Sequence, residues 1–208
     1  MNARTGGFLG IETKFIDYEY DAAVATTVAG AEADPATVNT LSAIAQGDGE
    51  SNRDGRKCTL KSIHIRAFLE NLQSAGTIVR LALIHDTQTN KAQLNSEDVF
   101  KAPTNAELSA VTLRNLQYSK RFRVLRDVCM PLHGNAVYNG AGTTATFNTA
   151  MIKWDVKLNI PVIHDGTTAA VSTITDNSLH LVAIAADISG SSAGNVQLRY
   201  FSRVRFEG

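Results

Sequence analysis

The sequence predicts an all-β protein, an eight-stranded jelly roll in which two antiparallel sheets pack together. Val, Ile, Thr and Phe gather in short runs, and clusters of Gly, Asn, Asp and Ser separate these runs. No long stretch keeps the 3.6-residue period of a helix. Eight such runs, joined by loops of very unequal length and without an internal repeat, fit a double-sheet jelly roll better than a propeller or a solenoid.

The chain of 208 residues, 44% of them hydrophobic, is long enough to bury the core of one domain, and we expect a single domain over 1–208. The predicted strands are 11–20, 57–70, 77–86, 121–131, 151–160, 170–176, 179–187 and 195–206. The long loops between them are 21–56, 88–120 and 132–150. In the second loop, Asn95 or Ser96 can cap a short helix.

Alternation along the predicted strands assigns side chains to the core or to the exterior. The expected core residues of three strands are Ile152, Trp154, Val156, Leu158 and Ile160; Val196, Leu198, Tyr200, Val204 and Phe206; and Phe122, Val124, Val128 and Met130. In the last strand this leaves Phe201 and three arginines outside, which predicts a strongly basic outer face.

Two strands depart from simple alternation. In 57–70 the apolar positions are even up to Leu60 and odd from Ile63, which predicts a β-bulge near Ser62. Residues 179–186 are apolar at both parities. Such a strand is either central and covered on both faces, or buried between subunits.

No motif indicates an enzyme, a cofactor or a metal site. His85-Asp86 and His164-Asp165 each end a predicted strand and enter a turn, where Asp commonly accepts a hydrogen bond from the backbone two residues on. No third ligand has metal spacing, the five histidines show no HxH pattern of a cupin, and Glu97 with Asp98 is a weak calcium candidate.

The two cysteines and the lengths of the apolar runs also limit the classes of function that the chain can have. Cys58 and Cys129 lie in apolar runs and are expected to be buried thiols. No apolar run reaches the roughly 20 residues that span a bilayer, and the N-terminus has no signal-peptide core, so we expect a soluble protein without membrane contact.

Positive charge is local in a chain with 20 basic and 20 acidic residues. Acidic residues lie in other segments, among them 12–21 and 97–107, which leaves room for one basic surface. For any single residue, a solvated side chain that prevents strand aggregation is the alternative interpretation. Together these basic residues are candidates for binding a phosphate backbone: Arg53, Arg56, Lys57, Lys61, Arg121, Arg123, Arg199, Arg203 and Arg205.

Three segments carry a family resemblance: "GFLGIETKFIDYEYDAA" (7–23), "LSAIAQGDGESNRDGRKCTLKSIHIR" (41–66) and "WDVKLNIPVIHDGTTAAVSTITDNSLHLVAIA" (154–185). In this order they resemble capsid proteins of circular Rep-encoding single-stranded DNA viruses, the circovirus-like group. Those capsids are similar in fold to the coat protein of satellite tobacco necrosis virus. The turn "GESNRDGRK" matches the Gly, Arg and Lys pattern of the family at Gly55, Arg56 and Lys57.

The resemblance implies a jelly-roll subunit that assembles into a small icosahedral shell of about sixty copies (T=1) around a nucleic-acid genome, bound without sequence preference. It implies location in the virion, with a soluble intracellular subunit before assembly. Capsids of this group usually begin with an arginine-rich arm, but only Arg4 and Lys14 precede or enter the acidic first strand here.

The predicted subunit contacts are apolar residues of the second long loop: Val99, Phe100, Leu108, Val111, Leu113, Leu116 and Tyr118. A local core beneath that loop is the alternative interpretation of the same residues. The rival function is an oligomeric jelly-roll binding module, such as a lectin-like or fibre domain, which would need exposed aromatic platforms. Trp154 shares its parity with core residues, which counts against a lectin-like site.

Overall fold

The computed structural model describes residues 13–24, 36–72, 76–101, 110–134, 148–187 and 196–208. Its strands are β1 (Thr13–Ala23), β2 (Ala36–Thr40), β3 (Lys57–Asn71), β4 (Thr77–Asp86), β5 (Phe122–Leu132), β6 (Thr149–His164), β7 (Ile174–Asp176), β8 (Ser178–Asp187) and β9 (Val196–Glu207). The short helices are α1 (Ser96–Val99), η2 (Leu116–Tyr118) and η3 (Val171–Thr173).

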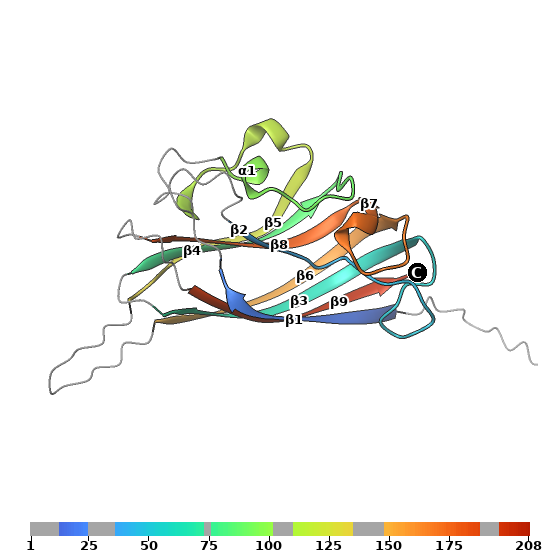
Figure 1. The fold of residues 1–208 in the computed structure, drawn as a ribbon, viewed down its shortest axis with the longest axis horizontal. Helices are drawn as coiled ribbons and strands as arrows, with labels where there is room; N and C mark the ends of the chain where they lie inside the picture. Colours follow the sequence, from blue (N-terminus) through green and yellow to red (C-terminus); the bar gives the residue numbers. More distant parts are fainter. Residues whose placement is uncertain (1–12, 25–35, 73–75, 102–109, 135–147, 188–195) are drawn as a thin grey trace, which may run out of the picture.

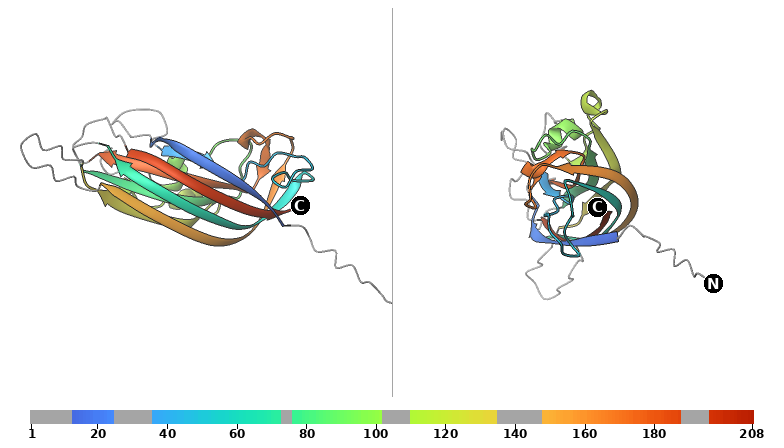
Figure 2. Two further views of the ribbon diagram at one scale, coloured as in Figure 1. Left: turned by 90° about the horizontal axis from the view of Figure 1, so that it is seen from below. Right: turned by 90° about the vertical axis from the view of Figure 1, so that its right-hand side faces the viewer.

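Two sheets form the two layers visible in Figure 1. The strand orders are β1-β9-β3-β6-β7 and β2-β8-β4-β5, and every pairing is antiparallel. Apart from the three-residue β7, each sheet has four strands, and neighbours in a sheet come from distant parts of the sequence. This arrangement confirms the predicted all-β jelly roll. The long strands run along the long axis of the molecule (Figure 2).

Two strand predictions differ from the structure. The segment 36–40, expected within a loop, forms the edge strand β2 on β8. Its five residues are too few for a clear alternation, so pairing with β8 decides its conformation. In the strand expected at 170–176, residues 171–173 form the short helix η3, and only the last three residues form β7.

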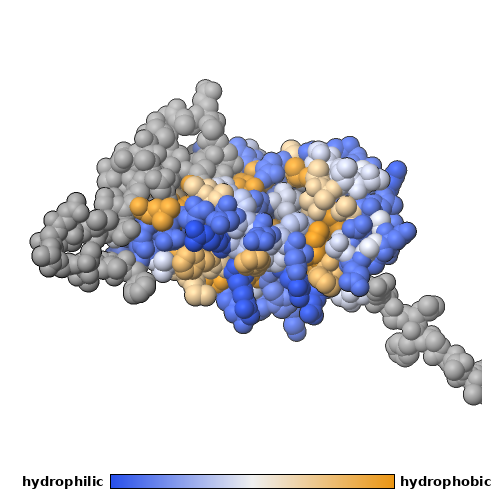
Figure 3. Space-filling view, turned by 60° about the horizontal axis from the view of Figure 1, so that its bottom comes forward, coloured by the Kyte–Doolittle hydropathy of each residue, from blue (hydrophilic) through white to orange (hydrophobic). Residues whose placement is uncertain are grey.

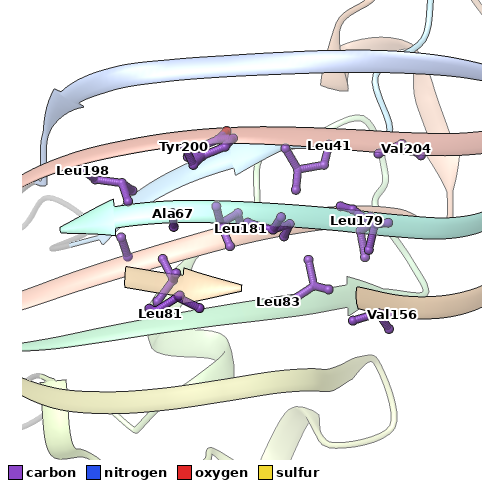
Figure 4. Packing of buried hydrophobic residues seen from close by; sticks show 14 of the residues in the cluster. Leu41, Ala67, Leu81, Leu83, Val156, Leu179, Leu181, Leu198, Tyr200 and Val204 are labelled. Atoms are coloured by element: carbon purple, nitrogen blue, oxygen red, sulfur yellow. The ribbon is translucent and has the colours of Figure 1, made fainter. Parts of the chain in front are cut away.

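The main core lies between the two sheets and follows the predicted alternation. Leu198, Tyr200 and Val204 of β9 belong to the same buried cluster as Leu81 and Leu83 of β4, and Figure 4 shows side chains of this cluster. The predicted core residues of β6 and β9 all belong to this cluster or pack against it, including the half-buried Trp154. Each large apolar side chain buried in this way contributes about 1.5–3 kcal/mol.

A second core lies on the other side of the four-stranded sheet, beneath the covering segment, which we define as residues 94–101 and 110–118. Its members are Ala82, Ile84, Leu94, Val99, Phe100, Ala110, Phe122, Val182, Ile184 and Ala186. Figure 1 shows α1 of the covering segment above this sheet. Strand β8 is therefore central and covered on both faces, the first of the two predicted alternatives. Asn95 caps α1 as expected, because its side chain accepts a hydrogen bond from the Glu97 N–H.

Two irregularities in register reset the facing of strands. The predicted bulge near Ser62 is confirmed, because the pairings of β3 shift between Leu60 and Ser62 and leave Lys61 as the extra residue. A second shift, between Leu83 and Ile84 of β4, leaves Leu125 of β5 as an extra residue.

Two predictions for β5 are wrong because of the second shift. Phe122 and Val124 pack into the second core, whereas Val128 and Met130 pack against the main core, so the four do not share a face. Beyond the bulge, Cys129 points away from the main core and is exposed, contrary to the expectation of a buried thiol. Cys58 is buried as predicted.

Candidate functional site on the outer faces of the sheets

The outer face of the five-stranded sheet carries most of the predicted basic residues. Strand β9 lies between β1 and β3, and its outward side chains are Arg199, Phe201, Arg203 and Arg205. All four are exposed, while the residues between them are buried. The predicted outward set of β9 is therefore correct.

This face is not strongly basic, which corrects the expectation from the sequence. Strand β1 pairs with β9, so its carboxylates lie beside the arginines instead of elsewhere. Arg203 donates from Nε and Nη2 to the two Asp17 carboxylate oxygens at 2.7 and 2.6 Å, and Arg199 donates from Nε to Asp21 Oδ1 at 3.0 Å. The hydrogen bond from Arg203 lowers the pKa of Asp17. Charges that are segregated along the chain are thus neighbours in space.

Further ion pairs cross the same face. Lys61, the extra residue of the bulge, pairs with Glu207 at 2.7 Å. Arg199 also donates to Glu70 at 3.2 Å. His64 and Asp155 form a hydrogen-bonded pair across β3 and β6, and this bond lowers the pKa of the Asp155 carboxyl.

Four cations on this face belong to none of the ion pairs found among the described residues: Lys57 and Arg66 on β3, Lys157 on β6 and Arg205 on β9. Two of them, Arg66 and Arg205, line a depression of about 530 Å³. Its lining residues are Asp17, His64, Ile65, Arg66, Lys153, Asp155, Phe201, Ser202, Arg203 and Arg205. In Figure 3 hydrophobic patches alternate with strongly hydrophilic ones over the underside of the molecule.

Arg66, Lys153, Lys157 and Phe201 were not in the set predicted from the sequence. The outward alternation of β6 already indicated the two lysines, but their proximity to Arg66 and Phe201 follows only from strand pairing. Arg66 is the register partner of Phe201 on one side and of Lys153 on the other.

Arg53 must be removed from the predicted surface set, because its side chain is fully buried, with 0% exposure. Its Nε donates to the Ile44 carbonyl at 2.9 Å, and its terminal nitrogens donate to the carbonyls of Gly55 and Gly166. Burial lowers the pKa of this guanidinium. Arg53 therefore joins two loops, while the neighbouring Arg56 and Lys57 are exposed.

Arg121 and Arg123 lie at the start of β5, on the other sheet, and do not join the basic residues of β9. Arg121 donates from Nε and Nη2 to the two oxygens of the buried Asp86 carboxylate at 2.9 and 2.8 Å, which raises the pKa of Arg121. Asp86 also accepts from the Gln88 N–H at 2.9 Å, as the turn sequence predicted. Asp86 is thus a structural residue.

The predicted interface residues divide into two groups. Val99 and Phe100 are buried in the second core, in agreement with the alternative interpretation of a local core. Val111, Leu113, Leu116 and Tyr118 are exposed, and Leu113 and Leu116 are 81% and 76% accessible. Leu108 lies outside the described residues.

The covering segment that presents these residues is held firmly to β4 and β5. The Arg80 guanidinium lies 3.7 Å from the Phe100 ring centroid and donates from Nε to Asp127 Oδ1 at 2.9 Å. It also donates to the Thr112 carbonyl at 2.6 Å. Val111 and Leu113 border a depression of about 400 Å³ next to this cluster. The exposed leucines therefore project from an ordered support.

Three of the histidines that the structure describes, His85, His164 and His180, are buried. His180 is buried and contacts Ser178 Oγ at 2.6 Å and Thr40 Oγ1 at 3.2 Å. Burial lowers the pKa of both His164 and His180 to about 4. Within the described ranges, no group of three or more His, Cys, Asp or Glu residues is placed to hold a metal ion. The same part of the chain contains no helix with the length and apolar character of a membrane span.

Comparisons with known proteins show likeness at the level of structure. No family model and no curated protein matches the sequence. The chain is similar to the structure of Desmodium yellow mottle tymovirus, with a TM-score of 0.38, 11% identity and coverage of 96% of this chain and 84% of the other. It is also similar to that of infectious bursal disease virus strain Gx, with a TM-score of 0.31, 11% identity and coverage of 94% and 36%.

A third similar structure is the STIV MCP, with a TM-score of 0.28, 8% identity and coverage of 92% of this chain and 48% of the other. These neighbours are viral capsid proteins with jelly-roll-like folds. All three TM-scores are below 0.5, so the likeness carries no argument about the function of this chain.

Proposed function

We propose that this protein is a viral capsid subunit that self-associates into a closed shell. The observation that carries the proposal is the pair of exposed leucines, Leu113 and Leu116, on the ordered covering segment. Exposed apolar patches on an ordered surface mark sites of protein–protein contact. Burial between copies of this chain would remove them from water, and closed symmetry allows each copy to use the same surface.

The finer form of the proposal is a T=1 shell of about sixty subunits, each a single jelly-roll domain over 1–208, around a genome of single-stranded DNA. The family resemblance of segments 7–23, 41–66 and 154–185 supports this form. Val111 and Tyr118 complete the proposed contact on the covering segment. Of the predicted genome contacts outside β5 and its start, six are exposed or half-buried: Arg56, Lys57, Lys61, Arg199, Arg203 and Arg205.

The test is light scattering after size exclusion, with negative-stain images, on the purified full chain at low and high salt. We expect closed, uniform shells from the natural sequence. The double substitution Leu113→Ser and Leu116→Ser should leave a folded subunit, because both side chains already lie in solvent, but should prevent shell formation.

Met151→Ser is the matched control, since Met151 is 85% exposed on the other sheet. It should assemble like the natural sequence. A natural chain that stays monomeric at every salt concentration would reject the capsid proposal. A chain that forms only a small oligomer and binds glycans would support the binding-module rival instead. Shells from the double variant would show that the leucines are not the contact.

A further inference from the structure

We propose that Phe201 is a stacking platform for a base of single-stranded nucleic acid, with phosphates held by Arg66, Lys157 and Arg205. The inference rests on the proposed function, since it names the residues and the chemical mode by which a shell subunit would contact its genome. It concerns the outer face of the five-stranded sheet.

The first observation is the exposure of Phe201. It lies in the interior of β9, between β1 and β3, and is 64% accessible. The other sheet has its outer face buried beneath the covering segment, but no described residue forms such a core over Phe201. A bare aromatic ring on a rigid central strand is suited to bind another flat apolar surface.

The second observation is the row of cations beside the ring. Arg66 is the register partner of Phe201 on β3, and Lys153 is the partner of Arg66 on β6. Adjacent strands are about 4.8 Å apart, so the row spans about 10 Å. Four residues along β9, Arg205 forms a second row with Ser62 and Lys157. The depression of about 530 Å³ lies in the same region.

The third observation is which charges are already neutralised. The Asp17 carboxylate is paired with Arg203. The Asp155 carboxylate is hydrogen-bonded to His64, and its Oδ2 lies 3.7 Å from Lys153 Nζ. Arg66, Lys157 and Arg205 belong to no ion pair among the described residues, so their charges are available to phosphates. Because the register partner of Phe201 on β1 is Glu19, which repels phosphate, the nucleic acid should run over the β3 and β6 side.

These features favour a single strand over a duplex. The bases of a duplex stack on each other and present only their edges, whereas unpaired bases present a face to an aromatic ring. Stacking on an aromatic side chain is worth about 1–3 kcal/mol per base and tolerates any base. This kind of contact suits a shell that packages a genome of arbitrary sequence.

The experiment compares two probes of equal charge: a fluorescein-labelled thymidine oligonucleotide of about 15 nucleotides and an abasic strand of the same length. Binding to the full chain is followed by anisotropy over a salt series, under conditions where light scattering shows free subunits. The substitution Phe201→Ala should weaken binding of the thymidine strand about 5- to 150-fold and leave the abasic strand unchanged. Phe201→Trp should restore affinity.

The triple substitution Arg66→Gln, Lys157→Gln and Arg205→Gln should weaken binding of both strands. It should also reduce the slope of log K against log salt by about 2, at roughly 0.7 per phosphate contact. Arg123→Gln, an exposed arginine on the other sheet, is the matched control and should change neither probe.

Two results would overturn the assignment: no binding of the thymidine strand by the natural chain, or equal effects of Phe201→Ala on both strands. Shell formation by the natural chain is scored separately by light scattering. If the natural chain forms shells but gives either of these binding results, the stacking site is rejected and the capsid proposal is kept. If binding is as expected but no shells form, only the capsid proposal is rejected.

Discussion

Replacing Arg53 with Met should destabilise the subunit and leave nucleic-acid binding unchanged. Methionine keeps the apolar stem but has no donor for the carbonyls of Ile44, Gly55 and Gly166. Because these carbonyls belong to two separate loops, the substitution removes the side-chain link between them. The same arginine looks like a phosphate ligand in the sequence, so the variant separates the two interpretations.

The magnitude follows from the burial of each acceptor. The Ile44 carbonyl belongs to a residue with no exposure, and a buried acceptor without a donor costs about 1–3 kcal/mol. Gly55 and Gly166 are half-buried, so water can replace part of their hydrogen bonds, at about 0.5–1 kcal/mol each. Removing the desolvated guanidinium offsets part of the sum. The expected net loss is about 3 kcal/mol, or about 6–12 °C in Tm for a chain of this size.

The assay is urea unfolding of the free subunit, followed by circular dichroism, with the oligonucleotide titration on the same samples. Arg56→Met is the matched control, because Arg56 is three residues away and exposed. It should unfold within about 0.5 kcal/mol of the natural chain. The reasoning is refuted if Arg53→Met unfolds like the natural chain but loses nucleic-acid affinity.

Three further predictions follow from buried or exposed side chains. His164 and His180 have a pKa of about 4 in the fold and about 6.5 when unfolded. The unfolded chain therefore binds more protons between these values, and the stability that is fully present above pH 6.5 falls by about 3 kcal/mol per histidine at pH 4. Urea midpoints from pH 7 to 4 measure this loss, and a midpoint independent of pH would contradict it. Ellman's reagent should titrate only Cys129 in the native subunit and also Cys58 after unfolding, because burial raises the pKa of the Cys58 thiol to about 11; two fast native thiols would show that the packing around β3 is wrong. Arg80→Met should cost about 2–3 kcal/mol and speed hydrogen exchange in the covering segment, because it loses both its carboxylate and its aromatic partner; unchanged exchange would show that the second core alone holds that segment.

Alternation of side chains made much of the fold predictable. Each face of a strand has a period of two, so the buried residues of β6 and β9 can be identified without knowing their partners. The change of parity within β3 likewise placed the bulge near Ser62. In β5 the same reasoning failed at Leu125. An apolar core lies on each side of that sheet, so the buried side chains of β5 are apolar both before and after they change from one face to the other.

The surfaces were less predictable, because charge on a sheet depends on which strands are neighbours. Asp17 and Arg203 are 186 residues apart in sequence and form a bidentate pair in the sheet. Arg53 lies three residues from Arg56 in the same polar segment, yet its guanidinium is enclosed by two loops that meet only in the fold. No local pattern contains such information.

The sequence by itself determined that the chain is all-β, where most strands lie and which of their side chains face the core, because these properties depend on residues a few positions apart. The tertiary structure alone decided which cations are free of carboxylates, which loop residues are exposed and which strand lies beside Phe201. Those properties depend on strand register and on loops that close over long sequence separations.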